Sequence, residues 1–227
     1  MLIRPAVMVA VIAAALAQSA AAGEPESAPP VGGVSEPLQT AQGFGGSTEQ
    51  PRRHFRVPNP AALSDREAAE IYLGLAGELA AIYARSGSRV VADYQTWQRY
   101  SSAPYKSMTH GRRYVSNYAN AQARAYGRYE EAGQLPVGSV VVKDSFVVTD
   151  EGEITLGPLF VMEKMAPGFN YVTGDWRYSM ISEAGEFLGE TGGEGAQRVE
   201  FCIACHLAQE DQDHLFFVPA ERRVTVE

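Results

Sequence analysis

The first hydrophobic repeat along the chain has the spacing of a helix. Apolar residues recur through residues 64–86 at positions such as Ile71, Leu75 and Ile82, which fall on one face of a 3.6-residue period. The segment begins at Ser64 with a capping-box pattern, a serine followed three residues later by a glutamate, and a glycine follows its end. These signals predict a helix over residues 64–86.

The next patterned stretch changes from a strand period to a helical one. Residues 113–119 alternate apolar and polar side chains as a half-buried strand does. Asn120 then stands where a helix cap is expected, ahead of residues 121–133, and Gly133 supplies a stop. We expect a strand followed directly by a second helix.

Three more segments have strand patterns and are separated by turn residues. Residues 140–148 are rich in β-branched side chains, and residues 153–165 follow after a Thr-Asp-Glu-Gly turn, so the two segments predict an antiparallel hairpin. Residues 175–181 predict another strand, the glycine-rich residues 185–197 predict a loop, and residues 202–206 predict a short helix. The whole pattern is typical of an α+β protein with an antiparallel β-sheet and a few packed helices.

The amino terminus has the three-part layout of a secretory signal peptide. One basic residue, Arg4, precedes an apolar run over residues 6–17, and small residues then offer a cleavage site before Gly23. The alternative is a membrane anchor, but the apolar run is shorter than the roughly 20 residues that span a bilayer. We therefore expect residues 1–22 to be removed, no membrane insertion afterwards, and a periplasmic protein.

Charge and composition narrow the function classes. The 227-residue chain has a formal net charge of −8, and loss of Arg4 with the signal peptide makes it −9. An acidic protein repels nucleic acids and anionic membranes, so neither is an expected partner. Residues 23–60 are dense in Pro, Gly, Ser and Glu and predict a disordered arm, which leaves residues 61–227 as the folded domain.

Both cysteines of the chain lie in one motif, Cys-Ile-Ala-Cys-His. A Cys-x-x-Cys-His segment fits covalent attachment of one haem c, in which Cys202 and Cys205 bond the porphyrin and His206 binds the iron as the proximal ligand. Three other interpretations are a disulfide or thioredoxin-like redox pair, a structural zinc site and coincidence. A zinc site prefers four ligands, whereas only three are adjacent here, and export is compatible with haem attachment.

The sixth position of the iron divides two function classes. A methionine or histidine there is typical of an electron-transfer cytochrome, whereas an open position is typical of a site for a small molecule. No residue has a spacing that identifies it as this ligand. The candidates are His110, His214, Met108, Met162, Met165 and Met180.

Four segments together resemble the cytochrome P-460 family, in the order in which that family has them. They span most of residues 97–220, and the haem motif near the carboxyl end is part of the resemblance. These segments are PVGSVVVKDSF (136–146), GPLFVMEKM (157–165), DWRYSMI (175–181) and FCIACHLAQEDQDHLFFVP (201–219).

The resemblance implies a homodimer with an antiparallel sheet, packed helices and a five-coordinate haem. In the enzyme branch of the family, a lysine is covalently bonded to a haem meso carbon and lies in a segment of the form G-x-V-x-V-K. Gly138 to Lys143 match this form, which makes Lys143 the implied cross-linking residue. By residue type alone, Lys143 would be a lysine on a solvated strand face.

The resemblance also implies an activity, the oxidation of hydroxylamine to nitric oxide or nitrous oxide. Electrons would pass to a periplasmic acceptor such as a soluble cytochrome c, and a carboxylate near the haem would remove protons. Glu163 matches the carboxylate region of the family. The alternative for Glu163 is an ion pair with Lys164 or Arg177.

Two other functions remain open at this point. The related cytochromes c-prime beta share the fold but bind nitric oxide without turnover, in a pocket lined by phenylalanines. Phe146, Phe160 and Phe169 are candidates for such a lining or for plain core. The remaining possibility is an electron carrier with a methionine or histidine as its sixth ligand.

Overall fold

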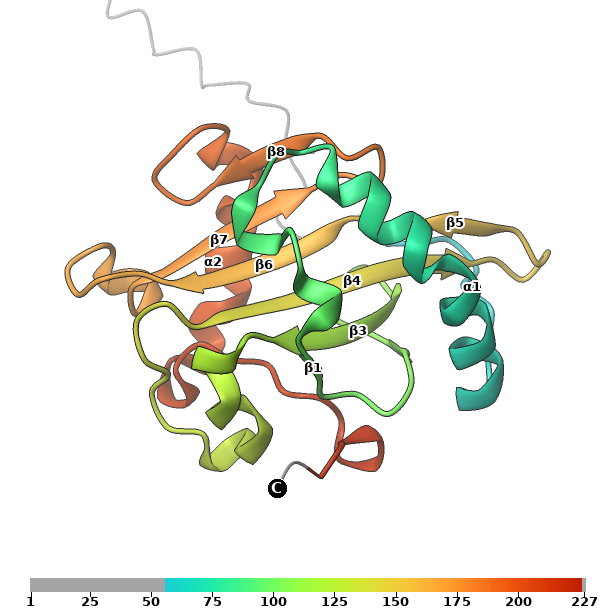
Figure 1. The fold of residues 1–227 in the computed structure, drawn as a ribbon, viewed down its shortest axis with the longest axis horizontal. Coiled ribbons are helices and arrows are strands. Elements are labelled where there is room, and N and C mark those ends of the chain that lie inside the picture. Colours follow the sequence, from blue (N-terminus) through green and yellow to red (C-terminus); the bar gives the residue numbers. More distant parts are fainter. Residues whose placement is uncertain (1–55, 226–227) are drawn as a thin grey trace, which may run out of the picture. The chain divides into compact units, whose positions relative to one another are not determined.

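The computed structural model describes residues 56–225, and in them an antiparallel β-sheet of eight strands confirms the α+β class. The strands run in the order β1-β3-β4-β6-β7-β8, with β2 also paired to β3 and β5 to β4 (Figure 1). The predicted signal peptide and most of the predicted arm lie outside the described residues. The strands are β1 (Gln98–Arg99), β2 (Tyr105–Lys106), β3 (Tyr114–Ala119), β4 (Val140–Val148), β5 (Ile154–Leu156), β6 (Leu159–Lys164), β7 (Trp176–Ile181) and β8 (Phe187–Glu190).

Helix α1 (Asp65–Ala84) lies over one face of this sheet (Figure 1). Its predicted capping box is confirmed, because the Ser64 side chain accepts from the Glu67 backbone N–H while the Glu67 carboxylate accepts from the Ser64 backbone N–H. Tyr72 and Leu79 of α1 are buried against apolar residues of the sheet. Within the described residues, no helix is both long and apolar enough to span a membrane.

The central strand β4 divides its side chains between two cores, as the period of a strand requires. Val142 and Phe146 belong to the core shared with α1, whereas Val141 belongs to the core on the opposite face. Helix α2 (Glu200–His206) contributes Cys202 to that second core. The short helix predicted around residues 202–206 is therefore confirmed, and it lies on the face opposite α1.

The segment predicted as a helix over residues 121–133 is a kinked 3₁₀ segment instead. Asn120 caps it as expected, since its side chain accepts from the Ala123 backbone N–H at 3.0 Å. The backbone leaves helical geometry at Ala123 and again at Tyr129, which has a positive φ of 56°. The Tyr129 hydroxyl donates to the Val224 carbonyl at 2.7 Å, so a tertiary contact holds the unusual conformation.

The strand predicted over residues 153–165 is two strands, β5 and β6. Both pair with β4, and the break between them falls at Gly157 and Pro158. A side chain at Gly157 would place its Cβ 2.3 Å from the Ser145 Oγ, and Pro158 has no N–H to continue the ladder. The close approach of the backbone to β4 at this point divides the predicted strand.

The prediction of a loop over residues 185–197 is wrong at β8, which pairs with β7. Gly189 lies opposite Met180, and a Cβ at this glycine would lie 2.3 Å from the Gly195 carbonyl oxygen. The glycine thus allows a strand to lie against the turn that follows it. The glycine-rich composition therefore reflects the close approach of two backbone segments and not an irregular loop.

Residues 57–60 fall within the predicted disordered arm, yet they pack against the folded domain. Val57 is buried and donates its backbone N–H to the Gly111 carbonyl at 2.8 Å. Pro60 forms an isolated antiparallel bridge with Thr149. These contacts hold residues 57–60 against the sheet despite their polar, proline-containing sequence.

A buried carboxylate lies between α1 and the sheet. Asp144 of β4 is fully enclosed, and its Oδ2 accepts from the Tyr72 hydroxyl at 2.5 Å and from the Tyr94 hydroxyl at 3.0 Å. The Tyr118 hydroxyl lies 2.6 Å from that of Tyr72. Burial raises the pKa of Asp144 to about 7, although the two tyrosine hydrogen bonds act in the opposite direction.

We expect Asp144→Asn to flatten the dependence of stability on pH. A carboxyl group with a raised pKa in the folded state stabilises that state most when protonated, so its contribution is full below about pH 4 and is lost as the pH rises to about 7. The loss is up to about 4 kcal/mol at 1.36 kcal/mol per pKa unit. Urea unfolding at several pH values measures it. Asp150→Asn, at an exposed turn, serves as the control, and an unchanged slope in Asp144→Asn would contradict the prediction.

Candidate functional site

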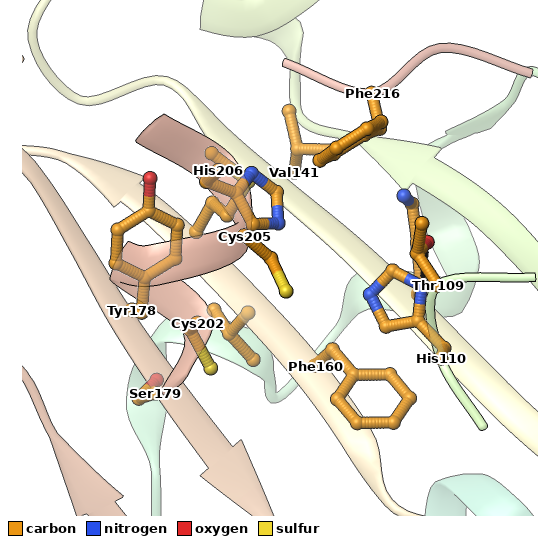
Figure 2. A pocket seen from close by; sticks show the side chains of 13 residues that line it. Thr109, His110, Val141, Phe160, Tyr178, Ser179, Cys202, Cys205, His206 and Phe216 are labelled. Carbon is orange, nitrogen blue, oxygen red and sulfur yellow. Dashed lines mark hydrogen bonds between the residues drawn. The ribbon is translucent and has the colours of Figure 1, made fainter. Parts of the chain in front are cut away.

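A pocket opens between α2 and the sheet face opposite α1. The side chains that line it come from α2, β4, β6 and β7, from the turn before β3 and from the chain after α2 (Figure 2). Most of the lining is apolar, with a few polar groups among it. The lining residues are Thr109, His110, Val141, Lys143, Phe160, Val161, Met162, Tyr178, Ser179, Cys202, Cys205, His206 and Phe216.

The two cysteines reach the pocket from successive turns of α2. Cys202 and Cys205 are not bonded to each other, and Figure 2 shows both sulfur atoms extending from the helix toward the pocket. Burial raises the pKa of the Cys202 thiol to about 12, so this thiol stays protonated at neutral pH. A thioredoxin-like pair needs a stabilised thiolate, which this environment does not provide.

His206 is buried at the end of α2, with its ring held by a backbone hydrogen bond. The ring Nδ1 lies 2.6 Å from the His214 carbonyl oxygen, which can only accept, so Nδ1 carries the proton. Nε2 then carries the lone pair, the arrangement of a histidine that binds a metal through Nε2. The rings of Tyr178 and Phe216 lie on either side, each with its centroid 5.0 Å from that of His206.

The carbonyl that accepts from His206 belongs to an unusual backbone segment. Asp213 and His214 both have positive φ angles, 53° and 61°, which are uncommon for residues other than glycine. Three contacts fix this segment from different elements: the Asp213 carboxylate accepts from the Lys164 ammonium at 2.5 Å and from the Leu135 N–H at 2.9 Å, and its carbonyl accepts from the Trp176 indole at 2.8 Å. We call these contacts the Asp213 clamp.

Lys143 points into the pocket from the centre of the sheet. It lies opposite Asn117 on one side and Phe160 on the other, and only 7% of its surface is exposed. Burial lowers the pKa of Lys143 to about 8, and its Nζ lies 6.0 Å from the centre of the Phe216 ring. Residue type alone would place this lysine in solvent, whereas the structure places it with the Cys-x-x-Cys-His residues.

Glu163 does not lie with these residues. It is opposite Val140 of β4, which belongs to the core shared with α1, and so it faces away from the pocket. Its carboxylate forms an ion pair with Arg177, which also pairs with Glu190. The structure therefore supports the ion-pair alternative for Glu163 and not the prediction that it removes protons at the haem.

The candidates for a sixth ligand are distributed over the molecule. His110 and Met162 line the pocket, whereas Met108 is 73% exposed. Met165 and Met180 are not among the lining residues. The His214 backbone carbonyl accepts from the His206 ring, and the His214 ring lies against Gly174. His214 therefore positions the proposed iron ligand His206 and is not itself placed to bind the iron.

The three phenylalanines also differ in position. Phe160 lines the pocket, while Phe146 stacks on Tyr114 in the core on the α1 side and Phe169 is 37% exposed. Sequence reasoning overlooked Tyr178 and Phe216, the two rings that contact His206. The alternation of side chains around Lys143 could not predict that Tyr178 lies nearby. Strand β6 lies between β4 and β7, so the position of β7 relative to β4 depends on the register of both pairings.

These residues fit a haem. The two thiols of α2 lie at the pocket wall, His206 has the tautomer of a metal ligand, and the surrounding rings and aliphatic side chains provide the apolar surface that a porphyrin requires. The fold and the site together define a haem-binding domain. The family model of cytochrome P460 matches residues 91–217, and the chain belongs to this family. No curated protein sequence matches the chain.

Proposed function

We propose that this protein is an exported monohaem c-type cytochrome that oxidises hydroxylamine to nitric oxide or nitrous oxide. The observation that supports the proposal is the position of Lys143, buried in the pocket that contains Cys202, Cys205 and His206. A lysine at this place is the feature of the enzyme branch of the family. Burial of an ammonium group is costly, so the buried position of Lys143 favours a role in the pocket over a place on a solvated strand face.

Each residue of the site has a distinct task in this proposal. Cys202 and Cys205 hold the single haem through thioether bonds, and His206 binds its iron through Nε2. Lys143 would bond through its neutral amine to the edge of the macrocycle, a step that would remove one N–H and one C–H hydrogen as protons and pass two electrons to an external oxidant. The lowered pKa increases the fraction of the neutral amine. Bound haem iron supplies a position for the substrate nitrogen and accepts its electrons.

The protein part of the mechanism consists of orientation, exclusion of water and proton removal. The hydrogen bond from His206 Nδ1 to the His214 carbonyl fixes the ring and increases the basicity of Nε2. Phe160 and Met162 cover the sheet side of the pocket with apolar surface. Conversion of one hydroxylamine to nitric oxide releases three protons and three electrons, so the pocket needs a proton acceptor as well as an electron acceptor outside the protein.

The test of the proposal is the chemical state of Lys143. Mass spectrometry of the haem peptide from wild-type protein should recover Lys143 bonded to haem, and the absorption bands should be shifted to the red. Lys143→Met should abolish both the red shift and hydroxylamine oxidation while keeping the haem on Cys202 and Cys205. Lys106→Met, outside the pocket, is the control. Recovery of unmodified Lys143 from active protein would overturn the cross-link.

One observation favours a second function, nitric oxide binding without turnover. Phe160 lines the pocket and lies near His110, with ring centroids 4.7 Å apart, so the pocket has an aromatic wall as cytochromes c-prime beta do. Stopped-flow spectroscopy separates the two functions. Rapid nitric oxide binding by a protein that does not oxidise hydroxylamine would select this second function.

The proposal includes a location and partners. The amino-terminal pattern supports export to the periplasm, and the acidic net charge of −8 supports a basic soluble cytochrome c as electron acceptor. The family resemblance supports a homodimer. Cell fractionation, size-exclusion chromatography and the salt dependence of electron transfer to a basic cytochrome c test the three statements separately.

A further inference from the structure

A second histidine lines the pocket at a place that no helix or strand pattern indicated. His110 lies in the turn that joins β2 to β3, is only 4% exposed, and packs its ring against Phe160. Figure 2 shows the His110 ring entering the pocket from a different side than His206, together with Thr109 and Phe160. The pocket is therefore bordered by imidazoles from two separate elements.

Two hydroxyl groups hold one edge of the His110 ring. Its Nδ1 lies 3.0 Å from the Ser107 Oγ and 3.1 Å from the Thr109 Oγ1. Two side chains hold the backbone of His110. Its N–H donates to the Ser107 Oγ at 3.3 Å, and its carbonyl accepts from the Arg113 guanidinium at 3.3 Å. Figure 2 shows the other nitrogen edge of the ring turned toward the pocket.

The hydroxyl groups of Ser107 and Thr109 can hydrogen-bond the His110 ring in both its neutral and its protonated form. When Nδ1 carries a hydrogen and donates it to either hydroxyl oxygen, Nε2 has the lone pair that accepts a proton from the pocket. After proton uptake at Nε2, Nδ1–H still donates to a hydroxyl oxygen, so no hydrogen bond is lost in the charged form. Imidazole is also the side chain that changes charge nearest to neutral pH.

The other titratable groups that the described residues contribute to the pocket are poorly suited to this task. Burial raises the pKa of the Tyr178 phenol well above its ordinary value, so this hydroxyl keeps its proton. Lys143 is committed to the haem edge in the proposed function, and the carboxylate of Glu163 lies on the opposite face of the sheet. Cys202, Cys205 and His206 would hold the haem in the proposed function.

We infer that His110 is the proton acceptor of the pocket, with Ser107 and Thr109 as the residues that position it. In the first step, an N–H or O–H bond of the bound substrate breaks, the electron pair stays on the substrate atom, and the proton goes to Nε2 of His110. The imidazolium then releases this proton to solvent before the next step. The inference rests on the proposed function only in naming hydroxylamine as the source of the proton.

Cyanide provides a test that does not involve hydroxylamine. At neutral pH it is present as the neutral acid, which must lose a proton when it binds ferric haem, whereas nitric oxide binds without proton loss. We expect His110→Gln in the haem-loaded protein to slow cyanide association by about 100-fold, the lower end of the range for general acid–base groups, while the nitric oxide association rate is unchanged. Added imidazole should restore cyanide binding in His110→Ala.

Two further variants guard against misfolding and nonspecific effects. Thr109→Val, at an exposed position, removes one of the hydroxyls that hold Nδ1 and should slow cyanide association by a smaller factor. Met108 lies in the same turn and is 73% exposed, so Met108→Leu should leave the association rates of cyanide and nitric oxide unchanged.

The outcomes separate this inference from the proposed function. Equal slowing of cyanide and nitric oxide in His110→Gln would show a steric role and overturn the inference. A low-spin ferric wild type that becomes high-spin in His110→Gln would also overturn it, because His110 would then be the sixth iron ligand. Selective slowing of cyanide in a protein that does not oxidise hydroxylamine would support the inference and reject the proposed function.

Discussion

Protein with alanine at both Cys202 and Cys205 is expected to lose nearly all covalently bound haem. The two thiols lie on one face of α2 at the pocket wall, and no other cysteine exists in the chain. Thioether bonds withstand denaturation, whereas haem held only by His206 and by apolar contacts is released when the fold opens. Haem staining after denaturing gel electrophoresis should therefore give a strong band for wild type and none for the double variant.

The single variants provide the matched controls. Cys202→Ala and Cys205→Ala each keep one thioether partner, so each should retain a weaker stained band. The double variant should also expose the pocket side chains that the porphyrin covers, which lowers its thermal stability by the loss of a ligand that binds only the folded state. A stained band of wild-type intensity in the double variant would contradict covalent attachment at these positions.

Lys164→Met, a substitution outside the pocket lining, is expected to cause a large loss of stability. The Lys164 side chain is 11% exposed and the Asp213 side chain 3%, so removal of one partner leaves a buried charge without compensation. Such changes cost about 3–5 kcal/mol. That is a large part of the roughly 5–15 kcal/mol by which a domain is stable. Urea unfolding of the haem-loaded protein measures this loss.

The same substitution should be visible at the haem. Without the ion pair, the Asp213 clamp loosens, and the His214 carbonyl is no longer held beside His206. A weaker hydrogen bond on Nδ1 makes the iron ligand less basic, so we expect the reduction potential to rise. Spectroelectrochemistry measures this change independently of activity.

A double variant distinguishes the buried charge from other causes of instability. Asn tolerates the left-handed backbone at position 213 and keeps an acceptor for the Leu135 N–H. Lys164→Met combined with Asp213→Asn therefore removes both charges and should recover much of the stability that Lys164→Met loses. Arg66→Met, in an exposed pair with Glu70, should have little effect. A double variant as unstable as Lys164→Met would contradict the argument.

Local sequence signals were sufficient to predict the helices and strands whose apolar residues recur with a regular spacing. The capping box at Ser64, the β-branched run of β4 and the alternation before Asn120 each correspond to the observed element. The failures occur where tertiary contacts decide the conformation. The backbone approach at Gly157 divided one strand in two, and the approach at Gly189 made a strand from a glycine-rich segment.

The site residues show the same division. The Cys-x-x-Cys-His motif identified its own residues, because they are neighbours in the chain. The face on which Glu163 lies depends on the register of β6 with β4. This register could not be predicted from the sequence, because the break before β6 interrupts the alternation of side chains. His110 was recognised only as one of several residues able to bind iron, since a polar turn has no period from which its direction could be predicted.

The neighbouring residues Lys143 and Asp144 serve opposite faces of the sheet. Insertion or deletion of one residue within β4 would exchange them, sending the carboxylate toward the porphyrin and the amine toward the tyrosines. Insertions and deletions should therefore be tolerated in the turns at either end of β4, whereas within the strand they should abolish function.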